Sequence, residues 1–180
     1  MALNRRAQLR HRAREIALQL IYMTSMRPES SEEDVMALLS DEDALSLFEK
    51  ELTTEGDERP VKEKFPFISA FDLELSDSEK DEVLNYASEM YHGVKDNENE
   101  IDAIIRANIE SSWRPDRLVA IDRAVIALAL YEGMLSGKVP VNVAISEAVE
   151  SAKTFGTEES SRFVNGVLGR IARKDEKPAD

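Results

Sequence analysis

The chain has 180 residues and a mass of 20.3 kDa, which suits one domain or two small ones. Its 23 basic and 36 acidic residues give a net charge of −13, and a chain this acidic, taken as a whole, is repelled by nucleic acid. Cysteine is absent, which excludes disulfides, iron–sulfur clusters, thiolate zinc sites and cysteine nucleophiles.

The charge, however, is unevenly distributed. Residues 29–102 hold 24 acidic and six basic residues, a net charge of −18, and the other 106 residues carry a net charge of +5. Residues 1–14 carry five arginines and no acidic residue. The net acidity therefore argues against nucleic-acid binding only as an average over the chain. The basic N-terminal end could still bind nucleic acid.

The sequence shows neither an apolar run long enough to span a membrane nor an apolar core after the N-terminal arginines like that of a secretory signal. We therefore expect a cytoplasmic protein without a membrane partner.

Apolar residues recur at steps of three and four along most of the chain, whereas the alternation typical of strands does not persist. This pattern predicts an all-α fold of about seven helices packed as a bundle. Short apolar runs at 32–40 and 42–52 permit two of the helices. The others are predicted at 5–25, from 76 to about 96, from about 101 to near 113, from 115 to about 135, from 140 to 156, and around 163–171, with a frayed tail from Lys174.

Local signals place some helix ends. Ser76 and Glu79 have the spacing of a capping box, which predicts the start of a helix. Gly137 is expected to break one helix and Gly156 to cap the next. Asn165-Gly166 lies within a helical apolar pattern, so we interpret it as a tight crossing between helices.

The segment Arg10-His-Arg-Ala-Arg14 is the sharpest chemical signal. Arginine carries a permanent charge and a planar fork that binds phosphate and stacks on bases. The alternative, weighed about equally, is a solvated helix face that neutralises the acidic segment. Tyr22, two turns further on, can stack on a base, although a tyrosine at the edge of the core is the simpler interpretation.

Signals of catalysis are absent from the sequence. It has two histidines and no cysteine for a metal site, and it lacks a Walker A loop, a dinucleotide-binding motif and a nucleophile elbow. We therefore expect neither an enzyme nor a bound metal or cofactor.

Four blocks in order resemble the NusB family of bacterial transcription antitermination factors. They are the opening helix from Arg12 to Tyr22, the central helix from Asp122 to Glu132, and two C-terminal blocks from Val139 to Gly156 and from Ser161 to Leu168. The resemblance implies a single NusB-like RNA-binding domain over residues 1–175, built as two small helical bundles. It leaves an acidic insertion at about 28–75 and a disordered tail at 176–180.

The resemblance also implies a function and a set of partners. These are boxA RNA of ribosomal RNA transcripts, the small-subunit ribosomal protein NusE and the RNA polymerase antitermination complex, with a possible homodimer. The implied RNA-binding residues are Arg6, Arg10, His11, Arg12, Arg14, Tyr22, Glu159, Arg162 and Phe163. The implied protein-partner residues are Asp116, Asp122 and Arg123, although Asp122 could face RNA instead.

Two alternatives to an RNA-binding antitermination factor stay open. One is a structural interaction module or homodimer with its arginines in the interface. The other is a stand-alone relative of the RNA-binding head of an rRNA methyltransferase, which without a cofactor domain would not catalyse alone. A separate hypothesis is that the acidic residues 29–64 cover the arginines until RNA displaces them.

Overall fold

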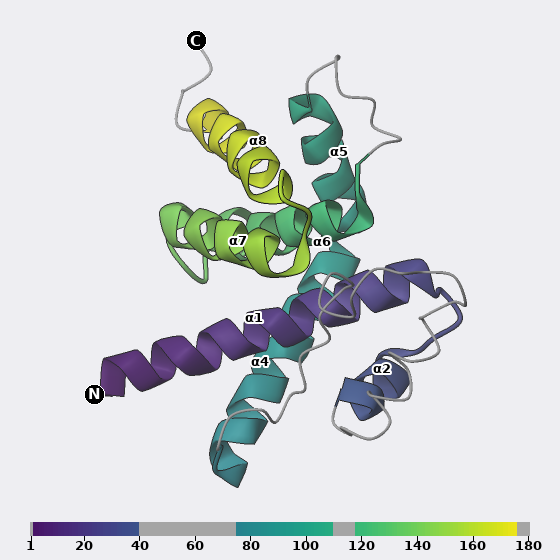
Figure 1. Ribbon diagram of the computed structural model, residues 1–180, viewed down its shortest axis with the longest axis vertical. Helices are drawn as coiled ribbons and strands as arrows, with labels where there is room; N and C mark the ends of the chain where they lie inside the picture. The colour runs from purple at the N-terminus through teal and green to yellow at the C-terminus, as the bar shows by residue number, and fades with distance from the viewer. Residues whose placement is uncertain (1, 40–74, 110–117, 176–180) are drawn as a thin grey trace. The chain divides into compact units, whose positions relative to one another are not determined.

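The computed structural model describes residues 2–39, 75–109 and 118–175 (Figure 1). All regular secondary structure in these ranges is helical, which confirms the predicted all-α fold. The chain divides into two compact units, Met1–Ser88 and Glu89–Asp180. The predicted helix at 42–52 lies outside the described residues.

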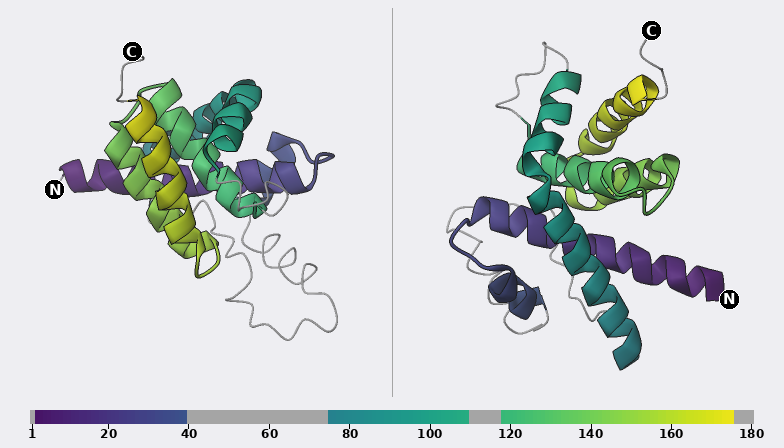
Figure 2. Two further views of the ribbon diagram at one scale, coloured as in Figure 1. Left: turned by 90° about the horizontal axis from the view of Figure 1, so that it is seen from above. Right: turned by 180° about the vertical axis from the view of Figure 1, so that it is seen from behind.

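The first unit contains α1 (Ala2–Met26), α2 (Glu32–Leu39) and the first part of α4 (Asp77–Asp96). The predicted helices at 5–25 and 32–40 are therefore confirmed. α1 packs on α2, and the right view of Figure 2 shows α4 crossing α1, which it also contacts through the bond from Arg5 to Glu79. The core face of α1 is the predicted one, with Leu9, Ala13, Ile16, Ala17, Leu20 and Thr24 all buried.

The start of α4 is fixed by the predicted capping box. The backbone N–H of Ser76 donates to the Glu79 carboxylate at 2.9 Å, and the backbone N–H of Glu79 donates to the Ser76 hydroxyl at 3.4 Å. These bonds satisfy two of the N–H groups that a helix start leaves without a partner. Ser31 and Asp34 make the same reciprocal pair at the start of α2.

The second unit contains the last part of α4 and then α5 (Glu98–Asn108), α6 (Ala120–Ala129), the π-helix η3 (Leu130–Leu135), α7 (Val141–Phe155) and α8 (Ser160–Asp175). α7 lies at the centre and packs on α6, η3 and α8, and α5 packs on α6 and α8. Gly137 has a φ of +60° after η3, and Gly156 caps α7, as predicted.

Three predicted boundaries are wrong. The helix expected to begin at 115 begins at Ala120, after Val119 in an extended conformation. It runs to Leu135 as predicted, although Leu130–Leu135 form a π-helix, in which the backbone N–H and hydroxyl of Ser136 both donate to the Tyr131 carbonyl at 2.8 Å. The helix expected to end near 113 ends at Asn108, whose carbonyl accepts a 2.9 Å bond from Arg170. α8 continues through Lys174 to Asp175, since basic residues in its last turn suit the negative end of the helix.

Close helix contacts occur at glycines other than the predicted one. A methyl group on Gly93 would overlap the ring of Tyr131, and one on Gly133 would lie 2.7 Å from the Ala144 Cβ. Gly166 is exposed, and no described atom lies within 4 Å of where its Cβ would be. The prediction of a tight crossing at Gly166 is therefore wrong, because this face of α8 is open.

Candidate nucleic-acid interface

α1 turns two of its arginines inward. Arg12 has a side chain only 11% exposed, and its Nη1 lies 2.9 Å from Glu15 Oε2. Arg14 is 6% exposed. Glu15, itself buried, directly follows residues 1–14, whose only charged side chains are arginines. Its carboxylate compensates positive charge inside the fold. Burial therefore gives Arg12 and Arg14 less access to an external phosphate than the other arginines of α1.

Arg5 is held by a carboxylate of α4. Its Nε and Nη2 donate to the two oxygens of Glu79 at 2.7 and 3.2 Å, a bidentate pair. The hydrogen bond from Arg5, followed by those from Ser76, lowers the pKa of Glu79 to about 2. The charge of Arg5 is thereby neutralised within the first unit.

Arg6 and Arg10 differ from Arg5 and Arg12 in that neither has a carboxylate partner among the described residues. Arg6 is exposed, and neither residue makes an ion pair with any part of the chain that the structure describes. The guanidinium carbon of Arg10 lies 3.7 Å from the ring centroid of Tyr86 on α4. Within the described ranges, these two positive charges are therefore not neutralised by a carboxylate.

His11 and Tyr22 complete the predicted residues of α1. His11 is exposed, and its Nε2 lies 3.5 Å from Glu15 Oε1, which is an ion pair only when the imidazole is protonated. Tyr22 is half-buried, and desolvation raises the pKa of its hydroxyl. This burial agrees with a tyrosine at the edge of the core and leaves part of the ring accessible.

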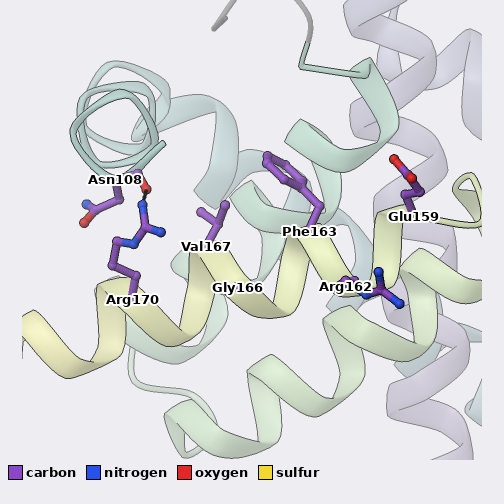
Figure 3. Close-up of a pocket in the computed structure, with 7 residues that line it drawn as sticks. All are labelled: Asn108, Glu159, Arg162, Phe163, Gly166, Val167 and Arg170. Carbon is purple, nitrogen blue, oxygen red and sulfur yellow. Dashed lines mark hydrogen bonds between the residues drawn. The ribbon is translucent and has the colours of Figure 1, made fainter. Parts of the chain in front are cut away.

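The second unit has a pocket beside α8, with a volume of about 480 Å³ (Figure 3). It brings together the three predicted C-terminal residues, Glu159, Arg162 and Phe163. The phenyl ring is half-buried, whereas the charged residues are exposed, and Arg162 has no ion pair within the described ranges. Asn108, Gly166, Val167 and Arg170 supply the remaining lining.

Two of the three predicted protein-partner residues, Asp122 and Arg123, have internal contacts. Asp122 is only 5% exposed, and burial raises its pKa, an effect opposed by its hydrogen bond with Ser160. Arg123 donates to Asp102 at 2.7 and 3.0 Å and to Glu98 at 3.3 Å, so it ties α6 to α5. Asp116 lies outside the described residues.

Sequence reasoning did not find Tyr86 and Glu79 of α4 or Asn108 and Arg170 beside the pocket. Each belongs to the site through contacts across helices, for which the chain has no local pattern. The capping box did identify Glu79, but only as a cap. The open face at Gly166 could have been suspected from a glycine inside a helix, which costs stability without an evident packing reason.

Within the described ranges, there is no cluster of three or more histidine and acidic side chains that could bind a metal ion. Among the helices of these ranges, none is long and apolar enough to cross a bilayer.

Comparison with known proteins gives a consistent family. The sequence model of the NusB family matches residues 47–173. The transcription antitermination protein NusB of Bacillus licheniformis is 37% identical over 123 residues, covering 63% of this chain and 94% of that protein. NusB of Clostridium botulinum (strain Kyoto) is 31% identical over 162 residues, covering 90% and 98%. The solved structure of T. maritima NusB matches with a TM-score of 0.62 at 28% identity, covering 92% of this chain and 91% of that one.

Proposed function

The chain belongs to the NusB family of transcription antitermination factors, and from this premise we propose that residues 1–175 act as a non-enzymatic RNA-binding domain. Its ligand is the boxA element of ribosomal RNA transcripts, which it binds together with the ribosomal protein NusE. The complex would act with the RNA polymerase antitermination machinery in the cytoplasm.

The observation that carries the proposal is the pair of arginines Arg6 and Arg10 on α1. Arg6 and Arg10 lie on a helix whose other arginines are buried or paired, and neither has a carboxylate among the described residues. Unneutralised arginines on one short stretch suit a polyanion, because guanidinium groups bind phosphate oxygens with several donors. His11, exposed beside Arg10, adds a third polar group on the same helix.

The pocket beside α8 supports a second contact with single-stranded RNA. Phe163 offers a partly exposed aromatic ring on which a base can stack, and Arg162 offers a cation without an ion pair among the described residues. Glu159 can accept hydrogen bonds from amino groups of a base. This combination of one ring, one cation and one acceptor is typical of base recognition outside a duplex.

For NusE we propose the part of the second unit that includes Asp116, Asp122 and Arg123. Arg123 is partly exposed beside Glu98 and Asp102, so the surface offers charges of both signs. Asp122 is buried, and its contribution would be to hold Ser160 at the start of α8 rather than to touch the partner.

Fluorescence anisotropy with labelled boxA RNA tests the function. Wild-type protein should bind boxA more tightly than a scrambled RNA of equal length, and NusE should increase the affinity. The double variant Arg6→Ala/Arg10→Ala should lower affinity for boxA, and the matched variant Lys153→Ala should not, because Lys153 is already paired with Glu150 at 2.6 Å. Equal binding of boxA and scrambled RNA would contradict the proposal.

The mass measured by size-exclusion chromatography tests the homodimer alternative, and RNA binding with and without NusE tests the methyltransferase-like alternative. A homodimer that uses its arginines as an interface should dissociate when Arg6 and Arg10 are replaced, and RNA should compete with it. A NusB-like head of an rRNA methyltransferase should bind structured ribosomal RNA without any effect of NusE.

A further inference from the structure

We propose that Tyr86 of α4 is a positioning residue that holds the guanidinium of Arg10 ready for an RNA phosphate. The inference rests on the proposed RNA-binding function, and it adds a residue to which no role in RNA binding has been assigned above. Both residues belong to the first unit.

The geometry is a stacked cation on a fixed ring. The Arg10 Cζ lies 3.7 Å from the centroid of Tyr86, well within the range of a cation–π contact. Tyr86 is 8% exposed, so its ring is immobilised by the surrounding core and offers one face to α1. The ring therefore acts as a rigid platform under a long side chain that would otherwise sample many rotamers.

The chemistry of the contact leaves the donors of Arg10 in place. A cation–π contact uses the flat face of the guanidinium, whereas its N–H groups point outward in the plane of the fork. Arg5 shows the opposite case, because Glu79 takes its Nε and Nη2 donors and its charge. α4 thus holds two arginines of α1 in different ways, one neutralised and one ordered but still able to bind an anion.

Ordering of this kind raises affinity because less conformational entropy is lost when RNA binds. Replacement of the tyrosine should therefore weaken RNA binding even though RNA need not touch it. The number of phosphates contacted should stay the same, since Arg10 keeps its charge.

Four variants test the inference by RNA anisotropy: Tyr86→Leu, Tyr86→Phe, Arg10→Ala and the double variant Tyr86→Leu/Arg10→Ala. Tyr86→Leu should weaken binding about three- to tenfold, as the loss of a cation–π contact implies. Tyr86→Phe should bind like wild type, because the phenyl ring retains the stacking face. In the Arg10→Ala background, Tyr86→Leu should have no further effect.

The salt dependence adds a readout that a purely structural role would not give. Arg10→Ala should reduce the slope of log affinity against log salt by about 0.7, the value for one phosphate on a single strand. Tyr86→Leu should lower affinity at an unchanged slope. If Tyr86→Leu weakens binding equally with and without Arg10, Tyr86 serves only the core and the inference is wrong.

Arg10→Lys tests the same contact by changing the arginine in place of the buried tyrosine, so that folding is not at risk. Lysine keeps the charge but lacks the planar fork, so its affinity should fall to the level of Tyr86→Leu. Wild-type affinity in Arg10→Lys would overturn the inference. Absence of boxA binding by wild type would instead overturn the proposed function, so the two failures are distinguishable.

Discussion

Glu79 is the residue at which the start of α4 is tied to the start of α1. Its carboxylate accepts two hydrogen bonds from Arg5 and two from Ser76, one from the backbone N–H and one from the hydroxyl. A carboxylate with this many donors is stabilised in its charged form, and the hydrogen bond from Arg5 is the largest cause of its lowered pKa. One side chain therefore caps a helix and neutralises an arginine of the candidate RNA-binding helix.

The lowered pKa of Glu79 predicts a pH-dependent stability. Its folded pKa of about 2 lies below the ordinary value of 4.5, so the carboxylate stabilises the fold above pH 4.5. This stabilisation should disappear as the pH falls from 4.5 to 2. The melting temperature of wild type minus that of Glu79→Gln should be constant and positive at neutral pH and should shrink across this window. A difference that does not change with pH would refute the charged pair.

Asp122 predicts the opposite dependence, because burial raises its pKa above the ordinary value of 3.8. The folded state then disfavours the charged carboxylate, and wild type should lose stability as the pH rises through the folded pKa. Asp122→Asn has a similar shape and no charge, so it should melt above wild type at pH 7. This advantage should diminish as the pH falls toward 3.8, and thermal melts between pH 3.5 and pH 7 measure it.

At the level of helices, two glycines inside helices have opposite roles. Gly93 on α4 lies against the ring of Tyr131, whereas Gly166 on α8 faces open space among the described residues. Gly93→Ala should destabilise the protein by about 1–3 kcal/mol, the usual cost of overpacking. Gly166→Ala should stabilise it by about 0.5–1 kcal/mol, since alanine is the better helix former.

Chemical denaturation of the two variants measures these changes in the free energy of unfolding. A double-mutant cycle with Tyr131→Ala tests whether the clash with the Tyr131 ring causes the loss in Gly93→Ala. Gly93→Ala/Tyr131→Ala should be destabilised by less than the sum of the two single variants Gly93→Ala and Tyr131→Ala, because the clash partner is gone. Equal stabilisation by both single glycine variants would show that helix propensity, and not packing, sets the effect at both positions.

The helices themselves could be predicted because each buries an apolar face with a regular spacing. The core face of α1 and the cap of α4 follow from residues three and four apart, which the sequence displays directly. The π-helix after Ala129 and the end of α5 at Asn108 depend on Ser136 and Arg170, which bond to carbonyls and have no periodic signal. A local bond made by Ser136 and a tertiary contact made by Arg170 therefore decide how these helices end.

The candidate site could be predicted in part for the same reason. The cluster of arginines is visible in the sequence, but which of them is neutralised depends on Glu15, Glu79 and Tyr86. Arg12 and Glu15 are three residues apart, so that pair could have been found from helix spacing. Contacts from α4 to α1 link residues more than 70 apart, and spacing does not reveal them.

For the whole molecule, the net charge of −13 says little about the response to RNA. At physiological ionic strength a charge is screened beyond about 8 Å, so a phosphate responds mainly to the side chains next to it. The acidic residues of 29–64, which we suggested could cover the arginines, lie largely outside the described residues. Among the described residues, Arg5 and Arg12 of α1 are neutralised by a carboxylate, whereas Arg6 and Arg10 are not.

This difference predicts how RNA affinity depends on salt. Arg6, Arg10 and Arg162 lack ion pairs among the described residues, and three phosphate contacts correspond to a slope of about −2 for log affinity against log salt. Arg6→Ala/Arg10→Ala should reduce this slope by about 1.4, whereas Lys153→Ala should leave it unchanged. Anisotropy titrations of boxA RNA between 50 and 300 mM salt, typical conditions for such slopes, measure both values.

The same titrations compare the buried arginines with the exposed ones. Arg12→Gln removes a charge that is already compensated by Glu15 at 2.9 Å, so the slope should change by much less than about 0.7. If Arg12→Gln reduced the slope by the value of a full phosphate contact, RNA would contact the largely buried side chain of Arg12. The assignment of Arg6 and Arg10 as the phosphate-binding residues would then have to be abandoned. A slope near zero in wild type would show that the acidic remainder of the chain cancels the arginines even at close range.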